Sequence, residues 1–169
     1  QAKLKQALLK RDPRTQLLKI NFDPTLVCLL REVKYFLLLD LDVPESALAI
    51  YKKAEVFRRQ TGNLDLIVNM YNTMQQTMLP VERPLIKNHM TKIDKTLTQG
   101  LRQLNWKSHG IDNFLQECMA AVQDANAVLA TMKGNLTKVE ALLEDGAAFD
   151  ARVESENPYN VITPELEGF

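Results

Sequence analysis

The feature that most restricts the fold is a run of apolar side chains in the second half of the chain, spaced alternately four and three residues apart. This spacing places every member on one face of an α-helix, so it predicts one long helix with a continuous apolar seam. At 1.5 Å per residue the helix is about 50 Å long, whereas a compact globule of this chain length is ~40 Å across. The seam consists of Ile111, Leu115, Cys118, Val122, Ala125, Leu129, Met132, Leu136, Val139 and Leu143.

The residues beside the seam indicate how this helix packs. With Leu115 at heptad position a, the g positions are mostly apolar, whereas a two-stranded coiled coil carries charged side chains there. The stripe is therefore wide enough for a bundle of three or more helices. An ordinary long amphipathic core helix is the alternative. The g positions are Phe114, Ala121, Val128, Asn135 and Leu142.

Two further helices are predicted to begin at prolines. Asp23 before Pro24 is typical of an N-cap followed by proline in the first helical turn, and the helix is expected to reach about Leu39. The next helix begins at Pro44, and its apolar residues keep heptad phase as far as Met78. Residues 44–78 therefore form either one helix or two helices that meet at Gly62, and the retained phase favours one.

A shorter helix is expected between these and the long one. Pro80 and Pro84 bracket a turn, after which the apolar pattern predicts a helix from Leu85 to Leu104. Ser108 is the expected N-cap of the long helix. No strand pattern is recognisable, so the predicted fold class is all-α, an elongated bundle of long antiparallel helices.

The chain is expected to divide into three segments. Leu4, Leu8 and Leu9 suggest the last turns of a helix, so residues 1–19 are predicted to be the end of a preceding helix and a connector. Residues 20–147 form the helical bundle. Residues 148–169 carry turn residues without an apolar stripe and are expected to be a poorly packed connector. Because the chain starts at Gln1 rather than Met, we expect it to be a piece of a longer protein.

Composition argues against several classes of function. Twenty-one basic and twenty-one acidic side chains cancel, so no attraction to nucleic acid or to an anionic membrane is expected. No apolar run approaches the ~20 residues that cross a bilayer, and no secretory signal is recognisable. Cys28 and Cys118 stand among apolar neighbours and are expected to be buried free thiols.

No residues suggest a catalytic, cofactor or metal site. The six glycines are scattered singly, so no phosphate-binding loop is present in the sequence. His89 and His109 lack the ligand spacing of a zinc site. Trp106 stands at a turn between helices and is expected to close the end of the bundle, with its indole N–H bonded to a turn carbonyl. The alternative is that Trp106 anchors a partner.

Several separated blocks of residues are more specific than the periodicity. In this order they resemble the N-terminal tail of dynein heavy chains, over roughly residues 20–143, and they are more similar to axonemal than to cytoplasmic heavy chains. The blocks contain Phe22, Asp23, Pro24, Arg31, Glu32, Tyr35, Pro44, Tyr71, Asn72, Glu82, Pro84, Trp106 and Ser108.

The resemblance implies a structural and assembly segment of a minus-end-directed microtubule motor that powers ciliary or flagellar beating. Such a segment holds the motor to its companion subunits and transmits force. The ATPase modules of this family, with their ATP and Mg²⁺, lie downstream of the tail, so no activity and no cofactor is expected in this segment.

The resemblance also implies partners and a location. The partners are other dynein heavy chains, intermediate and light chains, and docking proteins on axonemal microtubules. The location is the axoneme, after assembly in the cytoplasm. The alternatives are a non-motor helical scaffold of the spectrin-like or tethering-complex kind and the tail of a cytoplasmic-type heavy chain. A small helical enzyme is the weakest interpretation.

Overall fold

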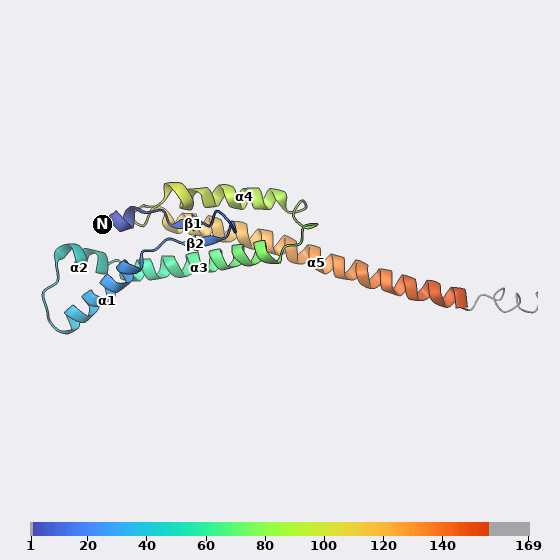
Figure 1. The fold of residues 1–169 in the computed structure, drawn as a ribbon, viewed down its shortest axis with the longest axis horizontal. Helices are drawn as coiled ribbons and strands as arrows, with labels where there is room; N and C mark the ends of the chain where they lie inside the picture. Colours follow the sequence, from blue (N-terminus) through green and yellow to red (C-terminus); the bar gives the residue numbers. More distant parts are fainter. Residues whose placement is uncertain (1, 156–169) are drawn as a thin grey trace, which may run out of the picture. The chain divides into compact units, whose positions relative to one another are not determined.

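A computed structural model describes residues 2–155, and within that range the chain forms five α-helices and a two-stranded antiparallel sheet (Figure 1). Two further short helical elements are not α-helical: η1 (Ala2–Lys5) is a 3-10 helix, and η2 (Gln99–Gln103) is a five-residue π-helix. The predicted, mainly helical fold class is confirmed. The elements are η1 (Ala2–Lys5), β1 (Leu9–Arg11), β2 (Leu18–Ile20), α1 (Pro24–Leu38), α2 (Glu45–Tyr51), α3 (Ala54–Thr77), α4 (Lys87–Thr98), η2 (Gln99–Gln103) and α5 (Ile111–Ser155).

The chain separates into two compact units after Asn126, and each is described by itself. The first contains every element up to the first part of α5, and the described part of the second is the rest of that helix, to Ser155. The prediction of one long helix is confirmed, although α5 continues past the expected boundary at residue 147. The rest of the expected connector, residues 156–169, lies outside the described residues. That the chain is an elongated bundle stays a prediction.

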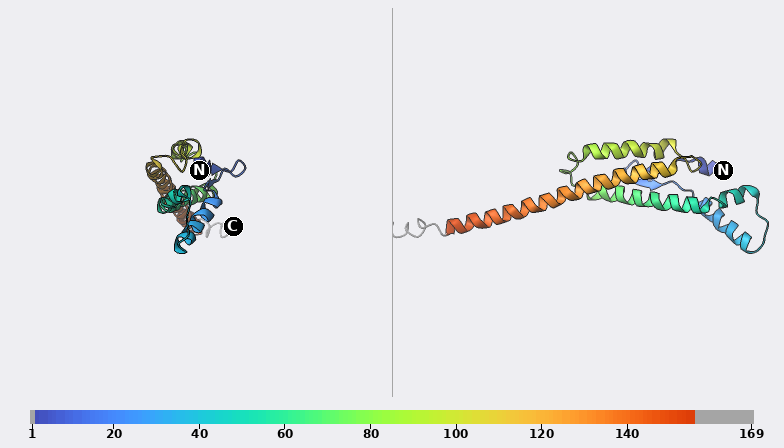
Figure 2. Two further views of the ribbon diagram at one scale, coloured as in Figure 1. Left: turned by 90° about the vertical axis from the view of Figure 1, so that its left-hand side faces the viewer. Right: turned by 180° about the vertical axis from the view of Figure 1, so that it is seen from behind.

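In the first unit, α3, α4 and the first part of α5 run alongside one another, and the hairpin of β1 and β2 lies against α3 and η2 (Figures 1 and 2). The beginning of the predicted seam is buried here. Since each buried Å² of apolar surface contributes roughly 25 cal/mol, this interior is the main source of stability. Its largest fully buried members include Leu64, Ile67, Tyr71, Met74, Ile86, Ile93, Leu97, Phe114 and Val122.

The hairpin corrects the prediction that residues 1–19 end a helix. Leu9 pairs with Ile20 and Arg11 pairs with Leu18. The side chain of Asn72 in α3 binds the backbone of Leu18 twice: its Nδ2 donates to the Leu18 carbonyl at 2.9 Å, and its Oδ1 accepts from the Leu18 N–H at 2.8 Å. The strands have three residues each, too few to show an alternating pattern, and a residue distant in sequence holds them.

Helix α1 begins as predicted and ends in a Schellman motif. The Asp23 side chain caps the helix by accepting from the Thr25 N–H at 2.8 Å, and Pro24 is the first helical residue. At the other end Leu41 N–H donates to the Phe36 carbonyl at 2.9 Å, and Asp40 adopts a left-handed φ of 55°. The left-handed backbone of Asp40 is therefore part of the stop of helix α1.

Replacing Asp40 by glycine is expected to raise the free energy of unfolding by about 0.5–1 kcal/mol, because glycine adopts the left-handed conformation without a Cβ penalty. Urea denaturation followed by circular dichroism measures the change. Asp42→Gly is the matched control, since Asp42 has no positive φ. Equal effects of the two substitutions would show that this backbone conformation carries no penalty.

The segment from residue 44 to residue 78 differs from both predicted alternatives. It is interrupted after Tyr51, between α2 and α3, whereas Gly62 lies inside α3. Lys52 is helical, with φ −59° and ψ −23°, and Lys53 has φ −94° and ψ 5°. Because these two residues stay close to helical geometry, the interruption inserts no loop and the heptad phase survives it.

The start of α5 corrects the prediction for Ser108. The helix begins at Ile111, and the Phe114 N–H donates to the carbonyl of Gly110 at 3.1 Å, so Gly110 is the N-cap. Gly110 has a φ of 84°, which favours glycine. The Ser108 hydroxyl instead accepts from the Asn105 N–H at 2.9 Å and closes the turn.

Candidate functional site

Trp106 is part of a cluster of three aromatic rings in the first unit. It is 4% exposed, and its indole Nε1 donates to the Asn21 carbonyl at 2.8 Å. Its ring meets Phe22 edge-on with centroids 4.9 Å apart and lies 6.5 Å from Phe57. As predicted, Trp106 is packed in the interior and its indole N–H binds a backbone carbonyl. We call Phe22, Phe57 and Trp106 the aromatic cluster.

Asn21 connects the aromatic cluster to the hairpin. Its backbone N–H donates to the Leu8 carbonyl at 2.9 Å, and its side-chain amide donates to the Ala7 carbonyl at 2.8 Å. Ala7 also forms an isolated antiparallel bridge with Asn105. The turn that carries Trp106 is thereby held to the beginning of the chain, although the two segments are far apart in sequence.

Tyr71 organises a second, polar cluster that joins the hairpin, α3 and α4. Its hydroxyl accepts from Arg11 Nη1 at 3.0 Å and from Gln75 Nε2 at 3.2 Å, and it donates to Asp94 Oδ1 at 3.1 Å. Arg11 Nη2 also meets Asp94 Oδ1 at 3.0 Å. Burial, and then the Asp94 carboxylate, raise the pKa of Tyr71. Because the Tyr71 hydroxyl, the Arg11 guanidinium and the Asp94 carboxylate all bind one another, this cluster is a structural junction rather than a reactive centre.

The turn between α3 and α4 contains another buried residue from the sequence blocks that resemble dynein heavy chains. Glu82 is 5% exposed, and its Oε2 accepts from the Leu79 N–H at 2.8 Å. Pro84 lies exposed in the same turn. The blocks therefore mark turns and junctions at several places in the first unit, and the structure does not bring them together into one site.

The C-terminal half of α1 exposes apolar side chains together with other residues of the blocks. Arg31, Glu32 and Tyr35 are all exposed, and Pro44, the N-cap of α2, follows nearby in sequence. We call the apolar residues between 35 and 41 the α1 surface; they are 42–70% exposed. A concentration of exposed apolar side chains in one short segment is typical of a protein interface. The α1 surface consists of Tyr35, Phe36, Leu37, Leu38, Leu39 and Leu41.

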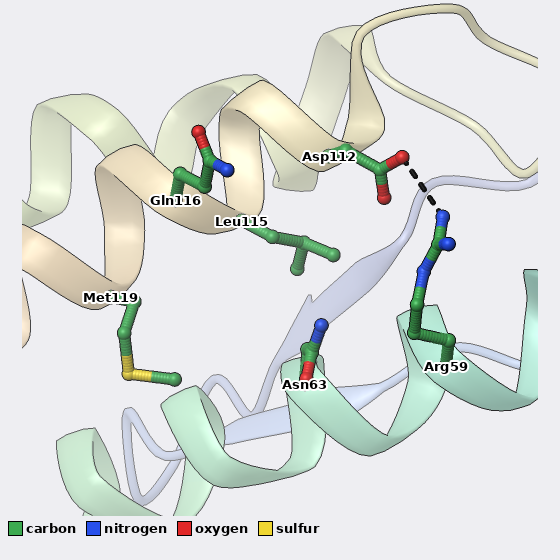
Figure 3. A pocket seen from close by; sticks show the side chains of 6 residues that line it. All are labelled: Arg59, Asn63, Asp112, Leu115, Gln116 and Met119. Carbon is green, nitrogen blue, oxygen red and sulfur yellow. Dashed lines mark hydrogen bonds and ion pairs between the residues drawn. The ribbon is translucent and has the colours of Figure 1, made fainter.

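A pocket of about 480 Å³ lies between α3 and the start of α5 (Figure 3). At its rim Arg59 Nη2 meets Asp112 Oδ2 at 3.0 Å, and both side chains are more than half exposed. An exposed ion pair contributes at most about 1 kcal/mol. The residues that line the pocket include no pairing of a nucleophile with a base, so its arrangement favours packing between helices over catalysis. They are Arg59, Asn63, Asp112, Leu115, Gln116 and Met119.

The two cysteines differ from each other. Cys118 is buried, as predicted, but Cys28 is exposed, because only Leu26 and Val33 of α1 are buried and Cys28 lies on another side of the helix. Burial raises the pKa of the Cys118 thiol to about 12. The thiolate is the reactive form, so the two side chains should react very differently.

At neutral pH, iodoacetamide is expected to alkylate Cys28 and to leave Cys118 unmodified until the chain unfolds, as measured by peptide mass mapping. The folded state keeps the Cys118 thiol protonated and thereby raises its pKa. The corresponding contribution to the free energy of unfolding is complete below the ordinary thiol pKa of 9.0 and is lost as the pH rises towards the folded-state pKa of about 12. Cys118→Ala should remove that part of the pH dependence. Alkylation of Cys118 in the folded chain would contradict its burial.

Two other kinds of site are absent from residues 2–155. No group of three or more histidine, cysteine, aspartate or glutamate side chains in this range is placed to hold a metal ion. No helix of the described part combines the length and apolar character needed to cross a membrane.

Comparisons with known proteins connect this geometry to a family. The family model "Dynein heavy chain, N-terminal region 1" matches residues 1–114. The flagellar outer-arm dynein beta chain of Chlamydomonas reinhardtii is 38% identical over an aligned region that covers 76% of this chain. The ciliary dynein beta chain of Tripneustes gratilla is 39% identical over 84% of the chain, and human dynein axonemal heavy chain 9 is 33% identical over 85%. The chain spans about 3% of the length of each of these relatives.

Proposed function

This chain belongs to the axonemal dynein heavy chains, those of cilia and flagella, within their N-terminal region, and we propose that it serves as a structural and assembly segment of the motor's tail. In this role it contacts companion subunits and transmits force between the motor and its anchorage. ATP hydrolysis would then belong to parts of the heavy chain outside this sequence. The proposed partners are other heavy chains, intermediate and light chains, and docking proteins on axonemal microtubules.

The observation that carries the proposal is the contrast between a tightly joined interior and exposed apolar helix surfaces. Fully paired polar side chains and the aromatic cluster tie the hairpin to α3 and α4, which suits a segment that must resist deformation. The α1 surface, by contrast, is open to contact. In the second unit, α5 also exposes apolar residues: Leu136, Val139, Leu142, Leu143 and Phe149.

The test is retention of dynein chains from a ciliary extract by the immobilised chain, with identification by mass spectrometry. Leu38→Glu combined with Leu39→Glu is expected to reduce retention, because charge is introduced into the α1 surface without touching the interior. Val81→Glu is the matched control, since Val81 is 70% exposed in the turn before α4, away from the α1 surface. Nucleotide turnover by the chain without retention of any dynein chain would overturn the proposal.

A further inference from the structure

A second pocket of the first unit, about 470 Å³ in volume, lies where α5 begins. We call it the α5 pocket. Its walls include the aromatic cluster residues Phe57 and Trp106, and its lining also includes Lys53, Gln60 and Lys107 together with residues 110–113. All of these residues belong to the same compact unit. The pocket thus combines an apolar wall with cationic and hydrogen-bonding groups.

The first turn of α5 brings unpaired donors to this pocket. The backbone N–H groups of Ile111, Asp112 and Asn113 donate to no acceptor among the residues that the structure describes. Gly110 at the N-cap has no side chain to accept from them, and the Ser108 hydroxyl is engaged with Asn105. Free N–H groups at the start of a long helix attract negative charge.

Gln60 supplies an independent indication of a ligand. It is only 7% exposed and lines the α5 pocket, yet its side-chain amide bonds to no other described residue. The amide N–H and C=O of Gln60 therefore remain available to a group that enters the pocket. An acceptor that enters the pocket would satisfy Gln60 and the first turn of α5 together.

The charges around the pocket favour a single negative charge. Lys53 and Lys107 are exposed cations at its edge, and His109 also lines it. Asp112 is the one carboxylate among the lining residues, and Arg59 compensates it at 3.0 Å. The Asp112 carboxylate, in the same helical turn, repels a phosphate dianion more strongly than a ligand with one negative charge. A carboxylate carries one charge and still offers two acceptor oxygens.

We propose that the α5 pocket receives the carboxylate of an aspartate or glutamate side chain from another polypeptide of the assembly. The Gln60 amide and the first N–H groups of α5 donate to the carboxylate oxygens, while Lys53 and Lys107 attract the acidic segment. The apolar wall at Phe57 and Trp106 accommodates the neighbouring part of the peptide. That the partner is a companion chain rests on the assembly role proposed above, whereas the binding chemistry depends only on this pocket.

The experiment titrates the ¹⁵N-labelled chain with the blocked peptide acetyl-Leu-Glu-Leu-amide and follows the amide resonances by NMR. The glutamate peptide should shift the Gln60 side-chain amide and the backbone amides of residues 111–113. The matched peptide with glutamine in place of glutamate should bind about tenfold more weakly, because it loses the charge-assisted hydrogen bonds. Inorganic phosphate is the third ligand, and tighter binding of phosphate than of the glutamate peptide would overturn the choice of a carboxylate.

Variants separate loss of binding from loss of folding. Gln60→Leu should weaken binding of the glutamate peptide about tenfold without lowering the thermal midpoint, because it removes the amide donor and keeps a side chain of similar size at a residue that is 7% exposed. Lys53→Gln with Lys107→Gln, both at exposed positions, should also weaken binding, and Arg58→Gln, a cation of α3 that does not line the pocket, should leave it unchanged. Unchanged binding in both the Gln60 and the lysine variants, or equal affinity for the two peptides, refutes the proposal. Because a synthetic peptide is the probe, that result is distinguishable from failure to retain dynein chains.

Discussion

Gly100→Ala is expected to lower the free energy of unfolding by about 1–3 kcal/mol, the usual cost of forcing extra volume into a packed interior. A Cβ at Gly100 would lie 2.4 Å from Cζ and 2.9 Å from Cε1 of Phe114. Gly100 is part of the π-helix η2, and its missing side chain allows the Phe114 ring to lie against the backbone. Urea denaturation monitored by circular dichroism measures the loss.

A double-mutant cycle tests the cause. Phe114→Leu removes the ring atoms that meet the new methyl group, so Gly100→Ala should cost clearly less in that background than in the native chain. Gly62→Ala is the control on a glycine with open surroundings: no atom lies within 4 Å of its added Cβ, and the substitution should stabilise α3 by about 0.5–1 kcal/mol. If both alanine variants behave alike, the contact with Phe114 has no effect on stability.

Trp106→Ala is expected to be the most destabilising change in the aromatic cluster, at about 3–5 kcal/mol. The substitution removes the ring that packs on Phe22 and Phe57 and leaves the Asn21 carbonyl without its donor. Because Asn21 also holds Ala7 and Leu8, the hairpin should loosen first. Hydrogen exchange of the hairpin amides measures this local effect, and chemical denaturation measures the global one.

Trp106→Phe separates the hydrogen bond from the packing. It keeps an aromatic ring but lacks the indole N–H, so it should cost about 1–3 kcal/mol, the penalty of an unsatisfied buried carbonyl. Circular dichroism is the suitable signal, because Trp106 is the sole tryptophan of the sequence. A loss in Trp106→Ala no larger than that of an exposed substitution such as Val81→Ala would contradict the role of Trp106 in closing the bundle end.

Local signals in the sequence were sufficient for the long helices. Asp23 before Pro24 carries its own capping chemistry, and the four-and-three spacing from Ile111 needs no knowledge of distant residues. The heptad pattern was less informative at Lys52 and Lys53, where two residues end one helix and begin another without disturbing its phase. The heptad pattern shows which side chains lie on the same face of a helix. It does not detect an interruption of the helix that leaves them on that face.

The hairpin and the α5 pocket depend on contacts between distant residues. Leu18 is held by Asn72, and the end of β2 is tied to the Trp106 turn through Asn21, so neither strand has a signal of its own. The burial of Trp106 is predictable from the sequence, because a lone large aromatic side chain at a turn usually packs. Gln60 gave no signal, since a glutamine in an amphipathic helix is ordinarily solvated. Only the fold shows that Gln60 is buried without a partner.

The double hydrogen bond between Asn72 and Leu18 has a consequence for aggregation. A short ribbon exposes N–H and C=O groups along its border, and such borders recruit strands from other molecules in amyloid growth. Asn72 occupies both backbone groups of Leu18 on that border, so an incoming strand finds no donor or acceptor there. The Asn72 carboxamide thus blocks strand addition at Leu18.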